Sequence, residues 1–306
     1  MWEELLLAAS NRMPIALALV NRTLSGPINI NCDHSDGMGA RDTGWIQIYA
    51  ENNQEAYDNF LQAMPIGENP DVRLPVMICQ DGFITSHAVE NIELCEDGEV
   101  KAFVGAYEPE NYLLKHENPL AVGPYGVSPY YMDAKIGQAE AMKNAKKAIL
   151  ETAKRFEEMT GRSYGFFEAY RLEDAETAVL LIGSSAGTAR AAVDKLRAEG
   201  RKAGMLKLRV FRPFPGEELA AALGHLKALA ILDKAESFSN AGGPLGAEVR
   251  GALYDLDVRP KTINYVYGLG GRDFRVEDCE TIFAALDEVV RTGETGARYR
   301  HLGQRE

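Results

Sequence analysis

The sequence predicts an α/β protein made of two doubly wound parallel-sheet domains, and three observations support this. Short runs that are apolar along their whole length recur, as in strands that are covered on both faces; residues 15–20, 74–79 and 178–182 are examples. Segments with helical periodicity separate these runs, which is the order expected of parallel strands joined by crossover helices. The chain has 306 residues, 46% of them hydrophobic, which is enough for two cores.

The first half of the chain contains strand-like and helix-like segments interrupted by two irregular stretches. Residues 21–43 are rich in Gly, Asn, Asp and Ser, which predicts a long loop with a short strand at 28–30. Residues 93–131 carry many Pro, Tyr, Asn and Gly, which is typical of a connecting stretch that lies over a surface. The regular elements expected here are helices at 1–11 and 54–63 and strands at 15–20 and 74–79.

In the second half of the chain, a long predicted helix is followed by a second series of alternating strands and helices. Residues 138–160 place their apolar side chains near one face, and Gly161 is expected to end this helix. We therefore expect one domain over residues 1–135 and a second over 136–306. The further elements expected are strands at 178–182, 205–211, 228–232 and 262–266, and helices at 188–199, 217–223, 245–254 and 277–290.

Charge and hydropathy exclude several classes of protein. The net charge is −12 and the pI about 5.1, which argues against binding nucleic acid over a broad surface. No apolar run approaches the roughly 18–20 residues that span a bilayer, and no basic-then-apolar leader opens the chain. We therefore expect a cytoplasmic protein without a membrane segment. The basic tail at 298–305 is expected to be a solvated end.

The cysteines do not predict a metal site. They are scattered, and none forms the C-x-x-C grouping of zinc or iron–sulfur sites. A disulfide framework is equally unsupported at this density. We expect reduced thiols with packing roles, and no metal bound by this chain. The four are Cys32, Cys79, Cys95 and Cys279.

Arg22 follows the first predicted strand, and ligands of open α/β sheets bind beyond the carboxyl ends of strands. An arginine there can hold a carboxylate through two parallel hydrogen bonds, which lysine cannot reproduce. The alternative is that Arg22 pairs with a nearby aspartate and only pins the loop. The residues alone leave both readings open.

A group of charged residues follows Arg22 in the same loop. A lone histidine between carboxylates is too unspecific to predict a metal site. We favour a network in which these charges satisfy one another and support the loop. The residues of this group are Asp33, His34, Asp36, Arg41 and Asp42.

Two further turns follow predicted strands. Asp81 comes just after the strand at 74–79, with Ser86 and His87 close behind. Adjacent Ser and His do not form a nucleophile–base pair, and no G-x-S-x-G motif is present, so a hydrolase is excluded. We expect His87 to be buried or to line a pocket. In the Gly-Ser-Ser-Ala-Gly turn at 183–187, a helix cap by Ser184 or Ser185 is favoured over an anion site.

Several motifs, taken together, resemble one known family. The sequence similarity follows the whole chain in order. The motifs are N-R-T-L-S-G-P-I-N-I at 21–30, D-H-S-D at 33–36, G-A-R-D-T-G-W-I-Q at 39–47, L-P-V-M at 74–77, D-G-F and S-H within 81–87, K-L-R-V-F-R-P-F-P at 207–215, and G-G-P-L at 242–245. They resemble the α-type subunit of pyruvate:ferredoxin oxidoreductases, the pyruvate synthases.

The resemblance implies a fold and a role for Arg22. The first domain would be a thiamine-diphosphate pyrimidine-binding domain, and the second would resemble the transketolase C-terminal domain. Arg22 occupies the position whose arginine binds the carboxylate of the 2-oxoacid. Family members carry a further stretch before the helix at 1–11, with a Y-P-I-T-P type motif and the glutamate that activates the cofactor. We therefore expect a truncated first domain, that glutamate upstream of Met1, and an isolated chain that is inactive.

The implied reaction converts pyruvate and coenzyme A into acetyl-CoA, CO2 and reduced ferredoxin, reversibly. Thiamine diphosphate with its Mg2+ and [4Fe-4S] clusters would be held mainly by partner subunits. These are a β subunit that binds thiamine diphosphate and ferredoxin-like γ and δ subunits. Two alternatives stay open: a subunit acting on a related 2-oxoacid or on oxalate, and a truncated, non-catalytic assembly module.

Overall fold

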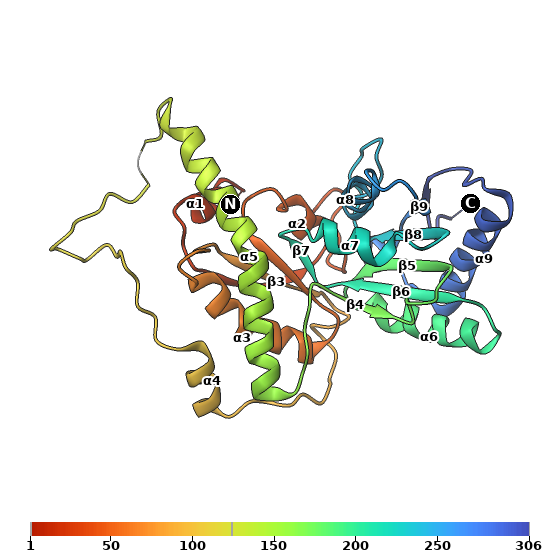
Figure 1. Cartoon of the computed structure of the whole chain (residues 1–306), viewed down its shortest axis with the longest axis horizontal. Coiled ribbons are helices and arrows are strands. Elements are labelled where there is room, and N and C mark those ends of the chain that lie inside the picture. The colour runs from red at the N-terminus through yellow and green to blue at the C-terminus, as the bar shows by residue number, and fades with distance from the viewer. Residues whose placement is uncertain (1, 124, 306) are drawn as a thin grey trace.

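The computed structural model describes residues 2–123 and 125–305, and it contains two sheets that lie side by side (Figure 1). Most neighbouring strands are parallel, so the predicted α/β class is confirmed. The sheets are mixed and not purely parallel as predicted, because one edge strand of each pairs antiparallel with its neighbour. The first sheet has the order β1 (Ala16–Asn21), β3 (Val76–Asp81), β2 (Ile46–Ala50), β7 (Val210–Arg212). The second has the order β10 (Tyr299–His301), β9 (Lys261–Val266), β8 (Ala228–Asp233), β5 (Thr177–Ile182), β6 (Ala203–Leu208), β4 (Phe167–Tyr170).

Helices cover the faces of both sheets. In the described part of the chain they are α1 (Trp2–Ser10), α2 (Ser35–Gly39), α3 (Asn53–Glu68), α4 (Asp97–Val104), α5 (Tyr130–Thr160), α6 (Ser185–Ala198), α7 (Gly216–Leu223), α8 (Pro244–Leu253) and α9 (Val276–Thr292), with a short 3-10 turn at Leu269–Gly271. Helices α3 and α5 pack on the first sheet, α6 and α9 on one face of the second, and α7 and α8 beside each other on its other face. No helix among the described residues is both long and apolar enough to cross a bilayer.

Local sequence explains where the main helices begin and end. Asn52 caps α3, because its side chain accepts a hydrogen bond from the Glu55 backbone N–H at 2.9 Å. Helix α5 ends at Gly161, whose φ of +73° is the left-handed conformation that a glycine adopts without strain. Its alanines and Ile149 pack against Ile66 of α3 and Ile78 of β3. This long helix therefore belongs to the core of the first sheet.

The two sheets share part of their hydrophobic interior. One buried cluster contains Met77 and Cys79 of the first sheet together with Leu180 and Leu208 of the second. Such a common core fixes the sheets relative to each other, because separating them would expose apolar surface. The predicted division of the chain between residues 135 and 136 stays a prediction.

The predicted strand at 205–211 is wrong as a single element. The chain leaves the second sheet after Leu208 and enters the first at Val210. Arg209 lies at the crossing and is buried, where its guanidinium donates to Asn59 at 2.8 Å and Gln62 at 3.2 Å. Burial lowers the pKa of Arg209 to about 10. An apolar run read along the sequence cannot reveal that its two ends pair in different sheets.

Other expectations also needed correction. The expected strand at 28–30 does not form, and the expected loop at 21–43 contains helix α2. The connecting stretch contains helix α4. The basic tail is no simple solvated end, because β10 pairs with β9 in parallel. Strands β2 and β4 were not predicted.

Candidate functional site

The two sheets meet near the carboxyl ends of four strands. In the first sheet, the last residues of β1 and β3, Asn21 and Asp81, are register partners. In the second sheet, Ser184 follows β5 and Lys234 follows β8. The Asp81 carboxylate binds both Ser184 and Lys234, so these four strand ends converge. Polar groups at such an edge are the usual ligand-binding groups of open α/β folds.

Arg22 stands at this edge, directly after β1, and its side chain is exposed. Its backbone N–H donates to Asp36 Oδ2 at 2.9 Å. Its guanidinium makes only a long contact, 3.5 Å, with the backbone oxygen of Thr23, and no carboxylate of residues 2–123 or 125–305 pairs with it. Asp36 therefore holds the backbone of Arg22 and leaves the guanidinium available to a ligand.

The loop around Arg22 exposes apolar side chains. Leu24, Ile28 and Ile30 are all exposed, Ile28 by 83% of its surface, and Val20 of β1 is 43% exposed. Apolar groups gathered on a surface favour contact with another molecule. A single cation set among them suits a ligand that has a carboxylate and an apolar or aromatic body.

Asp36 anchors the start of the loop. It accepts hydrogen bonds from Asn21 Nδ2 at 2.7 Å and from the backbone N–H groups of Arg22 and Gly37 at 2.9 and 2.6 Å. Burial raises the pKa of Asp36, and these hydrogen bonds oppose that rise. The acid is thus part of the framework that fixes Arg22.

The predicted mutual network of loop charges forms only in part: Arg41 and Asp42 make an ion pair, and Asp33 and Asp36 have other partners. Asp33 accepts from the backbone N–H and the hydroxyl of Ser35, at 2.9 and 2.6 Å, and meets none of its charged neighbours. Arg41 donates to the Met38 backbone oxygen at 2.9 Å and lies 3.5 Å from Asp42. The loop is held mainly by charge-to-backbone bonds, which hydrophilic composition alone does not predict.

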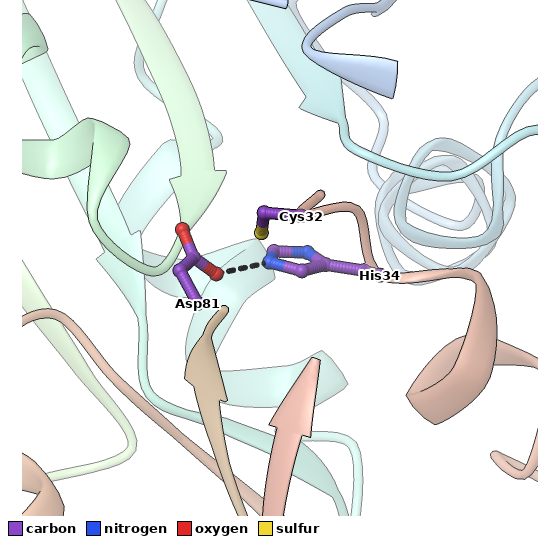
Figure 2. A group of neighbouring side chains, drawn as sticks. All are labelled: Cys32, His34 and Asp81. Atoms are coloured by element: carbon purple, nitrogen blue, oxygen red, sulfur yellow. Dashed lines mark hydrogen bonds and ion pairs between the residues drawn. The ribbon is translucent and has the colours of Figure 1, made fainter. Parts of the chain in front are cut away.

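Asp81 is the most enclosed charge at this edge, with 1% of its side chain exposed. Its Oδ1 lies 2.6 Å from His34 Nε2, and Figure 2 draws this contact as a dashed line. Its Oδ2 accepts from Lys234 Nζ at 2.7 Å and from the Ser184 hydroxyl at 2.5 Å. Burial opposes ionisation, yet Lys234 and His34 hold the pKa of Asp81 well below its usual value. The Asp81 carboxylate is therefore bound by His34 from the first half of the chain and by Lys234 and Ser184 from the second half.

Cys32, His34 and Asp81 have the donor types of a metal site and lie close together (Figure 2). Two features favour an ion-pair network instead. The Lys234 ammonium already supplies positive charge to Asp81 at 2.7 Å. Burial raises the pKa of the Cys32 thiol to about 12, whereas metal ligation requires the thiolate.

Two residues near this edge differ from expectation, and one was missed. Ser184 has the N-cap position of α6, but its hydroxyl donates to Asp81 and makes no cap hydrogen bond. His87 is exposed rather than buried; it stacks on Phe83, with ring centroids 4.4 Å apart. The missed residue is Lys234, and the one signal for it in the sequence is that it lies two positions after the predicted strand at 228–232.

Two family models match long stretches of this chain. The family described as "Pyruvate flavodoxin/ferredoxin oxidoreductase, thiamine diP-bdg" matches residues 1–154. The family described as "Pyruvate:ferredoxin oxidoreductase core domain II" matches residues 175–279. Both descriptions agree with the resemblance drawn from the motifs.

Individual relatives agree with these matches. Pyruvate synthase subunit PorA of Thermotoga maritima is 49% identical over 306 residues, which cover 100% of this chain and 77% of the relative. PorA of Methanocaldococcus jannaschii is 43% identical over 291 residues, 94% of this chain and 74% of the relative. Ketoisovalerate oxidoreductase subunit VorA of Pyrococcus horikoshii is 41% identical over 295 residues, 96% of this chain and 74% of the relative.

A solved structure shares the fold. The 2-oxoglutarate:ferredoxin oxidoreductase from Magnetococcus marinus, with 2-oxoglutarate, coenzyme A and succinyl-CoA bound, matches with a TM-score of 0.58 and 14% identity. The match covers 94% of this chain and 50% of that one. On the family matches and the relatives' identities, the chain belongs to the pyruvate:ferredoxin oxidoreductase family.

Proposed function

We propose that this chain is the α-type subunit of a pyruvate synthase and that Arg22 binds the carboxylate of pyruvate. The complex would convert pyruvate and coenzyme A into acetyl-CoA and CO2 and pass two electrons to ferredoxin, reversibly. The observation that carries the proposal is the exposed Arg22 guanidinium, unpaired with any described carboxylate, at the carboxyl end of β1. The 49% identity to a PorA subunit supports the choice of pyruvate.

Arg22 suits this task by geometry and by charge. A guanidinium donates two parallel hydrogen bonds to a carboxylate, so it fixes the orientation of the substrate as well as its position. The neighbouring exposed apolar residues Leu24, Ile28 and Ile30 would keep water from the ion pair once the pocket is closed by a partner. The keto carbon would then be held in one place, which lowers the entropic part of the barrier.

The residues at this edge fit one wall of a thiamine-diphosphate site. The apolar loop and Arg22 suit a ring and a substrate carboxylate. The nearby acids Asp36 and Asp81 are engaged with backbone groups and with Lys234, so neither is placed to hold a diphosphate-bound cation. Bound thiamine diphosphate supplies the carbanion chemistry that removes CO2 from a 2-oxoacid. This chain supplies substrate binding and exclusion of water.

The remaining cofactors are assigned to partners. We place the diphosphate with its Mg2+ on a β-type subunit and the [4Fe-4S] clusters on partner chains that include ferredoxin-like γ and δ types. The four separated cysteines support this division, since three are buried and none neighbours another in the sequence. Coenzyme A as co-substrate is supported by the Magnetococcus marinus enzyme, whose structure holds it.

Two units with different tasks are part of the proposal. Residues 1–135 would form the thiamine-type domain that carries Arg22, and residues 136–306 the transketolase C-terminal-like domain, with α5 and β7 of the second part packed on the first sheet. The two family matches, over 1–154 and 175–279, support a division of this kind.

A related 2-oxoacid is the second candidate substrate. The specific observation in its favour is the 41% identity to ketoisovalerate oxidoreductase subunit VorA, close to the values for several PorA subunits. The residues that bind a carboxylate would be common to both substrates. The side chain of the oxoacid therefore has to be tested directly.

The test uses the complex assembled from this chain and its cognate subunits. Ferredoxin reduction is measured with pyruvate, ketoisovalerate, 2-oxoglutarate and oxalate, and we expect the highest kcat/KM with pyruvate. Arg22→Lys should raise KM and lower kcat/KM by about 30- to 1,000-fold, equivalent to ~2–4 kcal/mol. Arg291→Lys, an exposed cation on α9 that pairs with Glu288, is the matched control and should behave as wild type.

Three outcomes would change the proposal. Unchanged KM and kcat in Arg22→Lys would remove Arg22 from the site. Preference for ketoisovalerate would move the chain to the second candidate. A complex that assembles and turns over none of the four acids would support a non-catalytic assembly module.

A further inference from the structure

We propose that the second α/β unit positions Arg22, through Lys234 and the turn at Leu269–Gly271. The inference rests on the proposed function, because it concerns the arginine assigned to pyruvate. The segment concerned is residues 22–34, called here the Arg22 loop. The Arg22 guanidinium hydrogen-bonds to the Thr23 backbone oxygen and, among the described residues, to neither Lys234 nor the turn, so both would be positioning elements and not catalytic residues.

The first support is a pair of hydrogen bonds between the turn and the middle of the Arg22 loop. The Gly271 backbone N–H donates to the Cys32 backbone oxygen at 2.8 Å. Asn29 Nδ2 donates to the Gly270 backbone oxygen at 3.2 Å. These bonds join segments about 240 positions apart in the chain, so only the packing of the two units brings them together.

The second support is the attachment of the end of the loop. The His34 backbone N–H donates to the Lys234 backbone oxygen at 2.8 Å. The His34 ring and the Lys234 ammonium meet on opposite oxygens of Asp81, at 2.6 and 2.7 Å. Residue 34 is thus fixed to the second unit through its backbone and, by way of Asp81, through its side chain.

The loop itself carries this restraint back to Arg22. The Thr23 backbone N–H donates to the Asn31 backbone oxygen at 3.0 Å. The Thr23 hydroxyl donates to the Asn29 backbone oxygen at 2.6 Å. Asn29 is the residue that the turn holds, and Thr23 is the neighbour of Arg22. A continuous path of short contacts therefore runs from Gly270 through Asn29 and Thr23 to Arg22.

The turn has no space for a side chain where it meets the loop. Gly271 has a φ of +77°, and a Cβ there would lie 2.5 Å from the Asn31 Cβ. Gly270 has a φ of +64°, and a Cβ there would lie 2.7 Å from Asn29 Nδ2. A methyl group at Gly271 must displace either the turn or the loop, because Cβ atoms do not approach so closely.

The test compares two glycine-to-alanine variants in the assembled complex. Gly271→Ala combines the positive φ with the collision against the loop. Gly293→Ala is the control, since its φ is +76° and nothing lies within 4 Å of the added Cβ. Both carry similar backbone strain, so Gly293→Ala shows the loss of thermal stability that strain alone causes, and Gly271→Ala should lose more because of its collision with the loop. Gly271→Ala alone should raise the pyruvate KM and lower kcat/KM by up to about 100-fold, because small misplacements of a substrate-binding group are costly.

A double variant separates positioning from general damage. If the turn acts through Arg22, then Gly271→Ala should cost little more kcat/KM in an Arg22→Lys background, since the positioned group is already impaired. Full additivity of the two losses would overturn the proposal. Asn29→Ala removes, without backbone strain, both the bond to Gly270 and the 2.7 Å bond that Asn29 Oδ1 accepts from the Asn31 backbone N–H. It should reproduce the KM effect in milder form and serves if Gly271→Ala does not assemble.

The two proposals fail in different ways. If Arg22→Lys leaves pyruvate kinetics unchanged, the proposed function of Arg22 falls. If Arg22→Lys has its expected effect while Gly271→Ala matches Gly293→Ala and Asn29→Ala matches wild type, only the positioning role falls.

Discussion

Asp81 and Asp233 occupy equivalent places in the two sheets, and they show how differently one residue type can be buried. Each ends a central strand, β3 or β8, and each is at most 3% exposed. Asp81 is bound by a lysine and a histidine, which hold its pKa well below the usual value although burial opposes ionisation. Asp233 has no cation at hydrogen-bond distance among the described residues, and burial raises its pKa to about 6.

The partners of Asp233 are neutral donors. It accepts from the backbone N–H groups of Leu245 and Gly246, in the first turn of α8, at 2.8 and 2.9 Å, and from Asn264 Nδ2 at 2.7 Å. These bonds favour the carboxylate but do not outweigh its desolvation. In these two buried acids the charged partners, more than burial or the number of hydrogen bonds, decide whether the pKa lies below or above its usual value. Asp81, the acid with charged partners, lies where the two sheets meet.

The largest expected effect comes from removing the cation of Asp81. Lys234→Met leaves a buried carboxylate with only His34 and Ser184, so unfolding free energy should fall by about 3–5 kcal/mol, measured by denaturant titration. Lys227→Met, which breaks an exposed pair with Glu176, should cost far less, because solvent screens that pair. Equal losses in the two variants would show that burial of Asp81 does not strengthen its dependence on Lys234.

A smaller loss of unfolding free energy is expected when one neutral hydrogen-bond donor to Asp81 is removed. Ser184→Ala removes the hydroxyl hydrogen bond but leaves both charged partners in place, so the loss should be about 1–2 kcal/mol by the same titration. Combined with Lys234→Met, the two losses should not add, because they share Asp81. Strict additivity would show that Ser184 stabilises the fold independently of that carboxylate.

The smallest expected effect concerns pH. Because the pKa of Asp233 is raised to about 6 in the folded chain, the folded state takes up a proton as pH falls from 7 to 5, while the unfolded state binds it only nearer 3.8. Asp233 should therefore add about 1 kcal/mol of stability over that window. Asp233→Asn should lose this increment when the pH dependence of its unfolding free energy is subtracted from that of wild type. Identical pH slopes would mean that Asp233 titrates normally.

The sequence was sufficient for the features that depend on local pattern. Continuous apolar runs predicted strands such as β5, and the position of Arg22 after one of them marked it as a candidate ligand-binding residue. The sequence was insufficient where distant segments meet. Lys234 lies 153 positions from Asp81, and nothing local indicates the pairing. Arg209 is buried because it bonds to Asn59 and Gln62 of α3. Nothing in the sequence around it indicates these distant partners, so residues 205–211 resembled one strand.

The strand β7 bears on how the chain can be divided for protein engineering. It follows β6 after one residue, yet it supplies the edge of the first sheet by pairing with Gln47 and Ile48. A chimera that takes its C-terminal half from a relative would therefore import a foreign edge strand into the sheet that carries Arg22. Exchange of substrate preference between relatives would then require matched grafting of residues 46–50 with residues 210–212, and not a single cut after α5.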